Sequence, residues 1–564
     1  MERRIFLHRL GVAAAMAQPS LVKASLGTHA ALQVVTDAVP KGARQLKLRL
    51  DGPADDAAFC GGPESVYATD LRQRSRFVRL DWTGDGVLSV EVPPQFPLAV
   101  NIYLALPEYG RLWVTLDNEG HGYPGDSALP LSVMEEAVKS QLAKCRRRLA
   151  EAQLPKPPTE ELERAEEGWK ARNLIMARRH ALRAGEDIEV EYANGFFKNG
   201  DASTALISGT LFGERQGEWA IGVGPDWSFG VPSPDFLRPK KCWMPIADLC
   251  NATTLPSFWR WIEPVRGSFN WRSLDAILDF AESRQMKAKS FALYWGGVGG
   301  TPPWFRQLKF GEQKAAIERW AQTLVKRYRG RIAAWETVNE MHDWPFANQG
   351  LWSHEQILDV SRMVNELVGA LDPGTPRVIN NCCTWGEYVQ GFMSSGMSGR
   401  AGRGVWCPLS FLEEAIHEGI PFESIGLQYY NPGRDLMECA SHLDRFRALG
   451  KQIWITEMGT PSSPRNKKGA GATEEDPLDG WRGPWSLERQ ADWCEQWYTI
   501  ALARKEVRAL NWWDFDDRQA FVASGGLLDS NCDPKPSYHR LIDLCKRLKV
   551  GAPAQAPWPC TFNK

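Results

Sequence analysis

Two glutamates at the ends of apolar, strand-like runs have the chemistry to work as a pair. Glu340 closes the run AWETVNE at 334–340, and Glu457 lies in the run IWITEMG at 453–459. Cleavage of a glycosidic bond needs one carboxyl group that donates a proton and a second that attacks carbon or activates water. A single glutamate at a strand end is usually a cap or an ion-pair partner. The prediction therefore rests on two of them occurring in matching positions.

Strand-like and helix-like runs alternate from about residue 218 to 548 and would position both glutamates. We expect strands at 220–223, 249–253, 288–295, 332–339, 377–381, 424–429, 452–456 and 509–513, with amphipathic helices such as 274–284, 312–328, 355–371 and 487–503 between them. Eight such units predict a (β/α)8 TIM barrel. Reacting groups in that fold lie at the C-terminal ends of the strands, so Glu340 after the fourth strand and Glu457 after the seventh would share one face.

Both runs, and several others in the same order, resemble glycoside hydrolase family 10, whose known members are chiefly endo-β-1,4-xylanases. The runs WETVNE at 335–340 and ITE at 455–457 are similar to the acid/base and nucleophile signatures of that family. The segments 263–269 (EPVRGSF), 425–428 (IGLQ) and 512–538 are similar to further motifs of the family. The resemblance covers most of residues 218–548.

The resemblance implies a role for each residue of the centre. Glu340 would be the general acid/base, Glu457 the nucleophile, and Asn339 would bind the sugar 2-hydroxyl. A retaining reaction of this kind needs carboxyl groups about 5–5.5 Å apart. Glu340 must be protonated at working pH, so we expect a negative Glu457 nearby to raise its pKa. The mechanism needs neither a metal nor an organic cofactor.

The expected substrate contacts depart from the pattern of the family. The loop at 253–260 lacks the glutamate and lysine with which family members hold the sugar on the non-reducing side. In the third strand, Phe291 and Gly296 replace two histidines, whereas Trp295 is retained. Tyr430 stands where the family has a histidine that contacts the nucleophile. A tyrosine can donate a hydrogen bond to Glu457 but carries no positive charge.

These changes predict a substrate cleft rich in aromatic residues. The residues that we expect to contact substrate are Asn339, Gln428, Tyr430, Trp295, Trp513 and Trp259. Trp295 and Trp513 also fit a packing role at the barrel mouth, and Phe521 stands near a further tryptophan position of the family. The segment 461–485 is rich in glycine, proline and charge and follows the nucleophile strand. It is either a lid or a surface loop.

The chain before the barrel predicts three further parts. Residues 1–26 resemble a twin-arginine export signal, with Arg3-Arg4 before a short apolar run; the alternative is a basic start without such a role. Residues 27–130 alternate at period two and predict an all-β sandwich, either a sugar-binding accessory domain or a structural cap. Residues 131–217 predict a charged helical linker followed by a small strand-rich stretch at 188–213. A C-terminal tail is expected at 549–564.

Composition narrows the partners of the 564-residue chain. With 67 basic and 68 acidic residues the net charge is -1, which argues against nucleic acid as a ligand. The 12 cysteines form no CxxC motif, so we expect no zinc site and mostly free thiols, with one or two disulfides at most. The apolar run near the N-terminus is too short to span a membrane. We expect a bacterial protein exported to the periplasm or beyond, of undefined oligomeric state.

Three functions stay open at this point. The first is an endo-acting β-1,4-xylanase, with a polysaccharide or oligosaccharide as its partner. The second is the same fold and mechanism applied to another β-glycan or in an exo mode. The third is a non-catalytic carbohydrate-binding protein on a barrel scaffold. The presence of Glu340, Glu457 and Asn339 argues against the third, because a binding protein has no need of a carboxyl pair.

Overall fold

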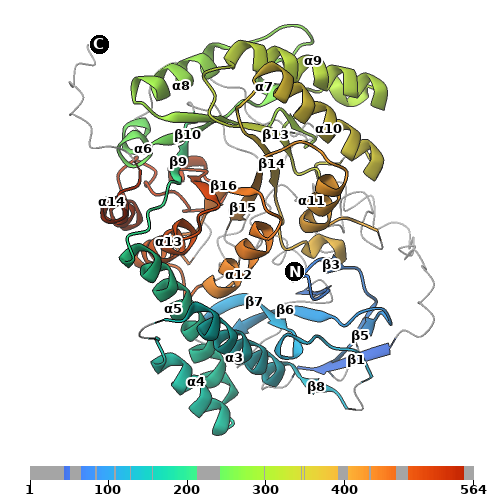
Figure 1. Ribbon diagram of the computed structural model, residues 1–564, viewed down its shortest axis with the longest axis vertical. Coiled ribbons are helices and arrows are strands. Elements are labelled where there is room, and N and C mark those ends of the chain that lie inside the picture. The colour runs from blue at the N-terminus through green and yellow to red at the C-terminus, as the bar shows by residue number, and fades with distance from the viewer. Residues whose placement is uncertain are drawn as a thin grey trace.

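The computed structural model describes residues 44–50, 65–82, 86–106, 109–126, 129–154, 157–212, 242–297, 299–344, 346–348, 350–390, 404–430, 433–464 and 480–551. The expected export signal, the expected strand at 220–223 and nearly all of the expected C-terminal tail lie outside these residues. The described part comprises a barrel, two N-terminal sheets and three helices that connect them (Figure 1). No described helix has the length and apolar character needed to cross a bilayer.

Eight strand positions form a closed parallel barrel. They are β9 (Leu206–Thr210), β10 (Ala252–Leu255), β11 (Lys287–Ser290) with its continuation β12 (Tyr294–Trp295), β13 (Trp335–Asn339), β14 (Arg377–Asn381), β15 (Ser424–Tyr430), β16 (Gln452–Gly459) and β17 (Val507–Trp512). Neighbours pair in the order β11-β10-β9-β17-β16-β15-β14-β13-β12. Backbone bonds from Ala333 N to Ala288 O (2.7 Å) and from Ser290 N to Ala334 O (3.1 Å) join the third strand to the fourth. The expected barrel is confirmed.

Helices follow the strands and cover the outside of the barrel (Figure 1). They are α6 (Trp243–Leu249), α7 (Trp259–Ile262), α8 (Arg272–Ser283), α9 (Phe310–Tyr328), α10 (His354–Leu371), α11 (Pro408–His417), α12 (Leu436–Arg447), α13 (Leu487–Leu502) and α14 (Pro536–Leu548). In α8 the buried residues Leu274, Ile277, Leu278 and Ala281 recur at helical spacing, which gives it one apolar face for the barrel.

The first barrel strand lies earlier in the chain than expected. β9 pairs in parallel with both β10 and β17, so the barrel begins before residue 218 and the predicted boundary there is wrong. The stretch from residue 188 is also not strand-rich at its start, because helix α5 (Leu174–Lys198) continues through it. The alternation of Ile188, Val190 and Tyr192 with glutamates imitates a strand. Helical packing prevails there because Ala184 and Ile188 share a buried face one turn apart.

The N-terminal region is strand-rich, as predicted. Its two four-stranded sheets have the orders β4-β5-β1-β8 and β3-β2-β6-β7. The strands are β1 (Arg44–Arg49), β2 (Val66–Thr69), β3 (Ser75–Arg76), β4 (Leu80–Trp82), β5 (Val87–Val92), β6 (Ala99–Leu106), β7 (Gly110–Leu116) and β8 (Leu131–Ser132). Along β1, Leu46 and Leu48 are buried while Gln45 and Lys47 are exposed, so the period-two pattern reflects one buried face.

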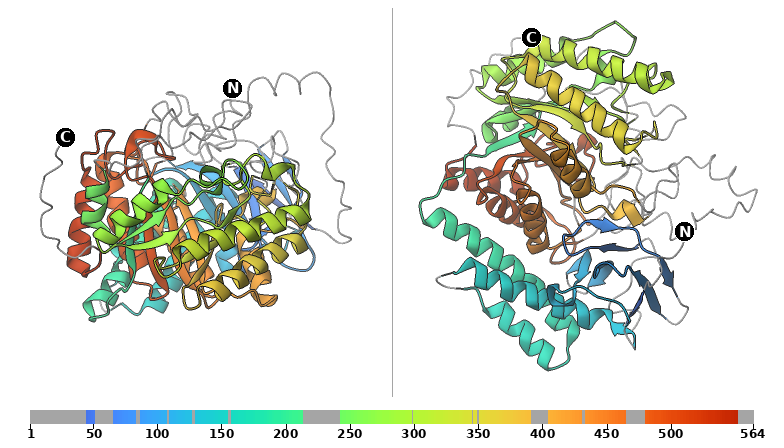
Figure 2. Two further views of the ribbon diagram at one scale, coloured as in Figure 1. Left: turned by 90° about the horizontal axis from the view of Figure 1, so that it is seen from above. Right: turned by 45° about the vertical axis from the view of Figure 1, so that its right-hand side comes forward.

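The three helices after the sheets form a packed layer and not a solvated linker. α3 (Val133–Ala152), α4 (Glu160–Lys170) and α5 lie with the sheets against one side of the barrel (Figures 1 and 2). The fully buried Glu186 of α5 accepts hydrogen bonds from Tyr109 Oη (2.6 Å), Trp481 Nε1 (2.6 Å) and Arg482 Nε (2.7 Å). One carboxylate therefore binds the N-terminal sheets to a loop of the barrel.

Candidate active site

The two predicted carboxylates face each other at the barrel mouth. Glu340 directly follows β13, Glu457 belongs to β16, and both are buried. The amide nitrogen of Gln428, on β15, donates to Glu340 Oε1 (3.1 Å) and to Glu457 Oε1 (3.0 Å). Two such bonds from one nitrogen cannot span more than about 6 Å, which is shorter than the separation of about 6.5–9.5 Å used by inverting enzymes. The arrangement fits the retaining geometry.

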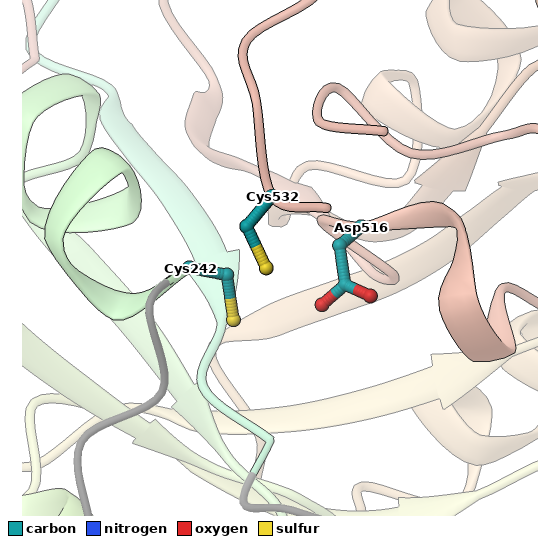
Figure 3. A group of neighbouring side chains, drawn as sticks. All are labelled: Cys242, Asp516 and Cys532. Atoms are coloured by element: carbon teal, nitrogen blue, oxygen red, sulfur yellow. The ribbon is translucent and has the colours of Figure 1, made fainter. Parts of the chain in front are cut away.

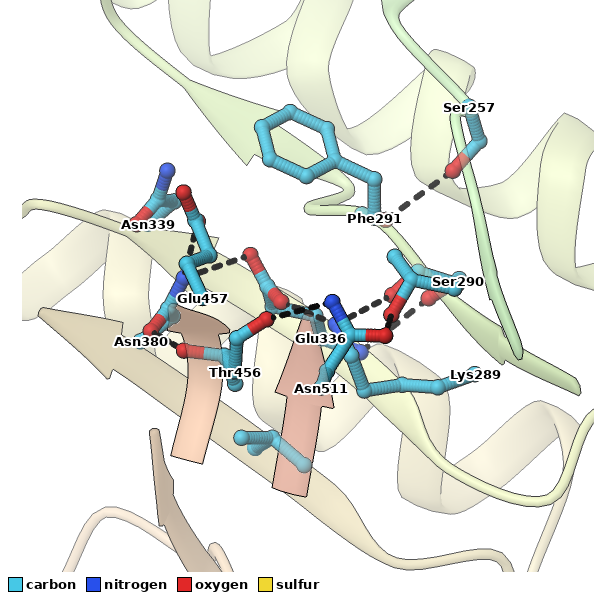
Figure 4. Close-up of polar contacts among 12 residues, drawn as sticks. Ser257, Lys289, Ser290, Phe291, Glu336, Asn339, Asn380, Thr456, Glu457 and Asn511 are labelled. Atoms are coloured by element: carbon cyan, nitrogen blue, oxygen red, sulfur yellow. Dashed lines mark hydrogen bonds and ion pairs between the residues drawn. The ribbon is translucent and has the colours of Figure 1, made fainter. Parts of the chain in front are cut away.

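Three donors surround Glu457. Asn380 Nδ2 and Gln428 Nε2 each donate to its Oε1 at 3.0 Å, and Tyr430 Oη donates to its Oε2 at 2.7 Å. Figure 4 shows Glu457 among the polar side chains at the barrel centre, next to Asn380 and Asn339. Hydrogen bonds of this kind stabilise a carboxylate anion and hold its side chain in one orientation. The bond from Tyr430 is the one that the sequence predicts.

Glu340 is held in a different way. Trp295 Nε1 donates to its Oε2 at 2.7 Å, and the backbone nitrogen of Glu340 donates to Asn380 O at 2.9 Å. Its φ angle is 59°, in the left-handed region that costs an L-residue roughly 1–2 kcal/mol. Such backbone geometry persists at sites where surrounding contacts aim a side chain. Cys382 also hydrogen-bonds Glu340, and burial raises the pKa of this thiol far above its usual range.

Burial is the main cause of the perturbed acidity of the pair. It raises the pKa of Glu340, and it raises the pKa of Glu457 well above its usual range, with further contributions from the charges of Glu336 and Glu340. The expected direction for Glu340 is therefore found, but desolvation and not the charge of Glu457 is its largest cause. Two carboxyls this close titrate as a unit. Each carboxyl has three donors, but the third donor to Glu340 is the weak thiol of Cys382. Glu457 instead has the hydroxyl of Tyr430 at 2.7 Å, which favours the anion on Glu457 and the shared proton on Glu340.

A buried polar layer beneath the pair was not foreseen. Glu336 of β13 is fully buried and forms an ion pair with Lys289 of β11. Asn380 Nδ2 also donates to Glu336 Oε1 at 3.2 Å, so one amide links this carboxylate to Glu457. The signal was present in the sequence, since a charged residue in the middle of a buried strand needs a partner inside the fold.

Of the three predicted tryptophans, Trp259 is misplaced. It is 2% exposed, lies parallel to Trp320 with ring centroids 5.6 Å apart, and donates through Nε1 to Glu263 Oε2 at 2.7 Å. The short helix α7 places it in the core behind the barrel wall, so the expectation that it contacts substrate is wrong. Trp295 is partly exposed beside Glu340. Trp513 is buried in the aromatic cluster described next.

An aromatic cluster occupies the barrel mouth beside the carboxylates. It contains Phe212, Phe258, Phe291 and Trp513, with Trp295 and Tyr430 packed against it. Phe291 contacts Trp295 edge-on at 5.9 Å and Trp513 at 5.6 Å. The polar side chains expected of the family on the second and third strands are thus replaced by a cluster of mostly buried aromatic residues. Sugar contacts by Trp295, Trp513 and Tyr430 stay predictions.

Two further positions near the pair are explained by local geometry. Asn339 is 1% exposed, and its Oδ1 lies 3.4 Å from the amide nitrogen of Gln428, next to both carboxylates. At Gly296, a Cβ atom would lie 2.1 Å from the carbonyl oxygen of Ala347. The loop after β13 occupies the space that a side chain would need, so the family's histidine cannot fit there.

Within the part of the chain that the structure describes, one group of potential metal ligands lies apart from the carboxylate pair. Ligand atoms of Cys242, Asp516 and Cys532 are within 4.8 Å of one another, at the start of α6 and in the loop after β17 (Figure 3). Arg518 binds Asp516 through Nε (2.9 Å) and Nη2 (3.1 Å) and already balances its charge. The expectation of no metal site stays a prediction.

The comparison with known families decides the identity of the barrel. Residues 256–355 and 406–544 match the family described as Glycosyl hydrolase family 10. The match contains both Glu340 and Glu457.

The chain belongs to glycoside hydrolase family 10.

The chain is similar to several proteins that are named xylanases. Endo-1,4-beta-xylanase B of Thermotoga neapolitana is 24% identical over 298 residues, which cover 51% of this chain and 77% of that protein. Endo-1,4-beta-xylanase 2 of Arabidopsis thaliana is 26% identical over 213 residues, covering 37% of this chain but only 18% of that protein. The solved structure of xylanase 10B from Thermotoga petrophila RKU-1 in complex with xylobiose is 20% identical with a TM-score of 0.45, covering 61% of this chain and 94% of that one.

The segment after β16 of this family 10 chain is packed against the rest of the fold at its far end. Residues 465–479 of the expected lid or loop lie outside the described residues. Trp481 and Trp485 are each 3% exposed, and Arg482 pairs with the buried Glu186 at 2.7 Å. The end of the segment is therefore packed against α5.

Proposed function

We propose that this family 10 enzyme is a retaining β-glycoside hydrolase that cuts β-1,4-xylan-type polysaccharide within the chain. One observation carries the proposal: a single amide nitrogen of Gln428 bonds both Glu340 and Glu457, which keeps the two carboxylates within about 6 Å of each other. The choice of xylan is supported by the relatives, which are named endo-1,4-beta-xylanases.

The geometry supports a double displacement. Glu340 donates its proton to the glycosidic oxygen as that bond breaks, while Glu457 attacks the anomeric carbon and forms a glycosyl ester. Glu457 loses its negative charge in this ester, so the pKa of Glu340 falls and Glu340 stays ionised after giving up its proton. As a carboxylate it then accepts a proton from the attacking water. That water attacks the anomeric carbon, the ester bond breaks, and both carboxyl groups return to their starting states.

A second candidate is the same mechanism on another β-glycan or from a chain end. The apolar cluster of Phe258, Phe291 and Trp513 favours it, because the cluster stands where polar sugar contacts are expected. A sugar at this position would meet the partly exposed rings of Trp295 and Tyr430 at the edge of the cluster and fewer groups that bond specific hydroxyls.

Product analysis on xylan, arabinoxylan and mixed-linkage glucan tests both candidates. A ladder of oligosaccharides from xylan supports the first, and single-sugar release or a preference for glucan supports the second. No reducing sugar from any β-glycan, with folded protein, would contradict the proposed activity. Glu457→Ala is the inactive control, and Glu488→Ala, on the exposed start of α13, is a matched control that should keep activity.

We also propose that residues 1–26 direct export of the folded enzyme to the periplasm or beyond. Arg3 and Arg4 before a short apolar run support this, and export would bring the enzyme to a polymeric substrate. Changing both arginines to lysine should leave the enzyme in the cytoplasm of a bacterial host, measured by activity in cell fractions. Unchanged export would contradict the proposal.

A further inference from the structure

We propose that the buried Lys289–Glu336 ion pair is a positioning pair for the nucleophile: it orients Glu457 through Asn380 and sets the pH range in which that carboxylate is ionised. The inference rests on the proposed function, since it assigns Glu457 as the nucleophile. It concerns two residues that touch neither the substrate nor the scissile bond.

The pair is built into the interior of the barrel. Lys289 is 2% exposed on β11 and Glu336 is 0% exposed on β13. Besides its bond to Glu336 Oε2, Lys289 Nζ donates to Ser290 O at 3.0 Å, and the backbone nitrogen of Glu336 donates to Ser290 Oγ at 3.1 Å. Burying two charges costs free energy that hydrophobic residues of similar size would not cost. We therefore expect a buried ion pair at this position to have a role other than stabilising the fold.

Asn380 connects the pair to the nucleophile. Its Nδ2 donates to Glu336 Oε1 (3.2 Å) and to Glu457 Oε1 (3.0 Å), while its Oδ1 accepts from Thr456 Oγ1 at 2.5 Å. Figure 4 shows Lys289, Glu336, Asn380 and Glu457 at the centre of the barrel in one set of contacts. With both ends of its amide occupied, Asn380 cannot turn, so the position of Glu336 determines where the nitrogen points toward Glu457.

The charges that face Glu457 explain why the positive charge of Lys289 is needed. From β13 it faces two carboxyls, Glu336 and Glu340, and from β15 the neutral Tyr430. Beyond these, Asp514 after β17 faces Tyr430 and the neutral thiol of Cys382 faces Glu340. Among the described residues acting on Glu457, Lys289 is the cation, and it opposes the rise in the pKa of Glu457 that burial and Glu336 cause.

The two partners are therefore expected to act in opposite directions. Without Lys289, the charge of Glu336 is unopposed and Glu457 takes up a proton at higher pH, so activity is lost earlier on acidification. Without the charge of Glu336, Glu457 stays ionised to lower pH. Glu340 responds in the same direction, since the charge of Glu336 also raises its pKa. Both limbs of the bell-shaped profile of kcat/KM against pH should therefore shift in the same direction.

The test compares pH profiles of kcat/KM for the full chain and for Lys289→Met, Glu336→Gln and the double variant, with an aryl β-xylobioside. We expect Lys289→Met to move the acidic limb up by about 1 pH unit or more, and Glu336→Gln to move it down. The double variant should return close to the wild type. Lys287→Met, exposed on the same strand, is the matched control and should leave the profile in place.

Profiles that keep their position, with activity lowered equally at every pH, would overturn the inference and leave the pair a structural feature. Circular dichroism confirms folding of each variant. Glu336→Gln keeps the size of the side chain and its bond to Asn380. Its pH profile therefore tests the inference even where Lys289→Met does not fold. A wild-type chain without glycosidase activity would instead contradict the proposed function, a separate outcome.

Discussion

Tyr430 at the end of β15 donates a 2.7 Å hydrogen bond to Oε2 of Glu457 on the neighbouring strand β16. A neutral donor thus lies next to Glu457, the proposed nucleophile, and burial raises the pKa of this tyrosine well above its usual range. Tyr430 therefore keeps its proton throughout the working range of pH. The support that it gives to Glu457 is a hydrogen bond and not a charge.

Removing the hydrogen bond from Tyr430 to Glu457 is predicted to slow the reaction. Tyr430→Phe should lower kcat/KM roughly 10-fold to 100-fold, because a hydrogen bond to a charged group contributes about 1.5–3 kcal/mol. Thermal unfolding should change little, since the ring and its packing against Phe521 remain. Tyr192→Phe on the outer helix α5 is the matched control. An unchanged rate in Tyr430→Phe would remove the tyrosine from the reaction.

Trp295 is predicted to lower the pKa of Glu340, the proposed acid/base. Its N–H bond to Glu340 favours the ionised carboxyl and so lowers the pKa of Glu340. Trp295→Phe removes this bond, so the pKa should rise and the alkaline limb of the pH profile should move to higher pH. Measuring kcat/KM against pH checks this, with Trp169→Phe on α4 as the control. An alkaline limb that stays in place, or moves down, would contradict the assignment.

Glu340→Ala should affect substrates according to their leaving groups. Xylan hydrolysis should fall by several orders of magnitude, because the glycosidic oxygen leaves only when protonated. Dinitrophenyl β-glycosides need little protonation, so formation of the glycosyl-enzyme should be largely spared. Added azide should then speed turnover by replacing the water that Glu340 no longer activates. Equal losses on both substrates would argue against the acid role.

Gly296 is predicted to tolerate no side chain. Gly296→Ala places a Cβ 2.1 Å from Ala347 O, so either the strand end or the loop after β13 must move. We expect a loss of about 1–3 kcal/mol in the free energy of unfolding, measured by denaturant titration. Gly311→Ala, where nothing lies within 4 Å of the new Cβ, is the matched control. Equal stability of the two variants would show that the loop after β13 can move at little cost in free energy.

The parts of the fold that were predictable are those with a local pattern. Seven barrel strands and the positions of Glu340 and Glu457 at the barrel mouth follow from short runs whose alternation reports burial directly. β9 was assigned to the wrong part because its partners, β10 and β17, lie far away in the chain. Pairing over such distances leaves no signal in a run of five residues.

The residues that surround the two carboxylates were less predictable from the sequence than the carboxylates themselves. Trp259 and Trp295 look equivalent in the sequence, yet one faces Trp320 in the core and the other Glu340 at the barrel mouth. The direction depends on a single turn of helix, α7, that directly follows a strand loop. Lys289 gives no signal in the sequence, because lysines usually stay in solvent, and only the position of Glu336 on a neighbouring strand gives it a buried partner.

The central claim is that Glu457 attacks the anomeric carbon, and trapping the covalent intermediate tests it most directly. An activated 2-deoxy-2-fluoro β-xylobioside should inactivate the enzyme, and mass spectrometry of peptides should find one sugar on Glu457. Glu457→Ala should stay unlabelled. A label on Glu340 or on any other residue, or rapid turnover of wild-type enzyme on the unmodified glycoside without any labelling, would contradict the account.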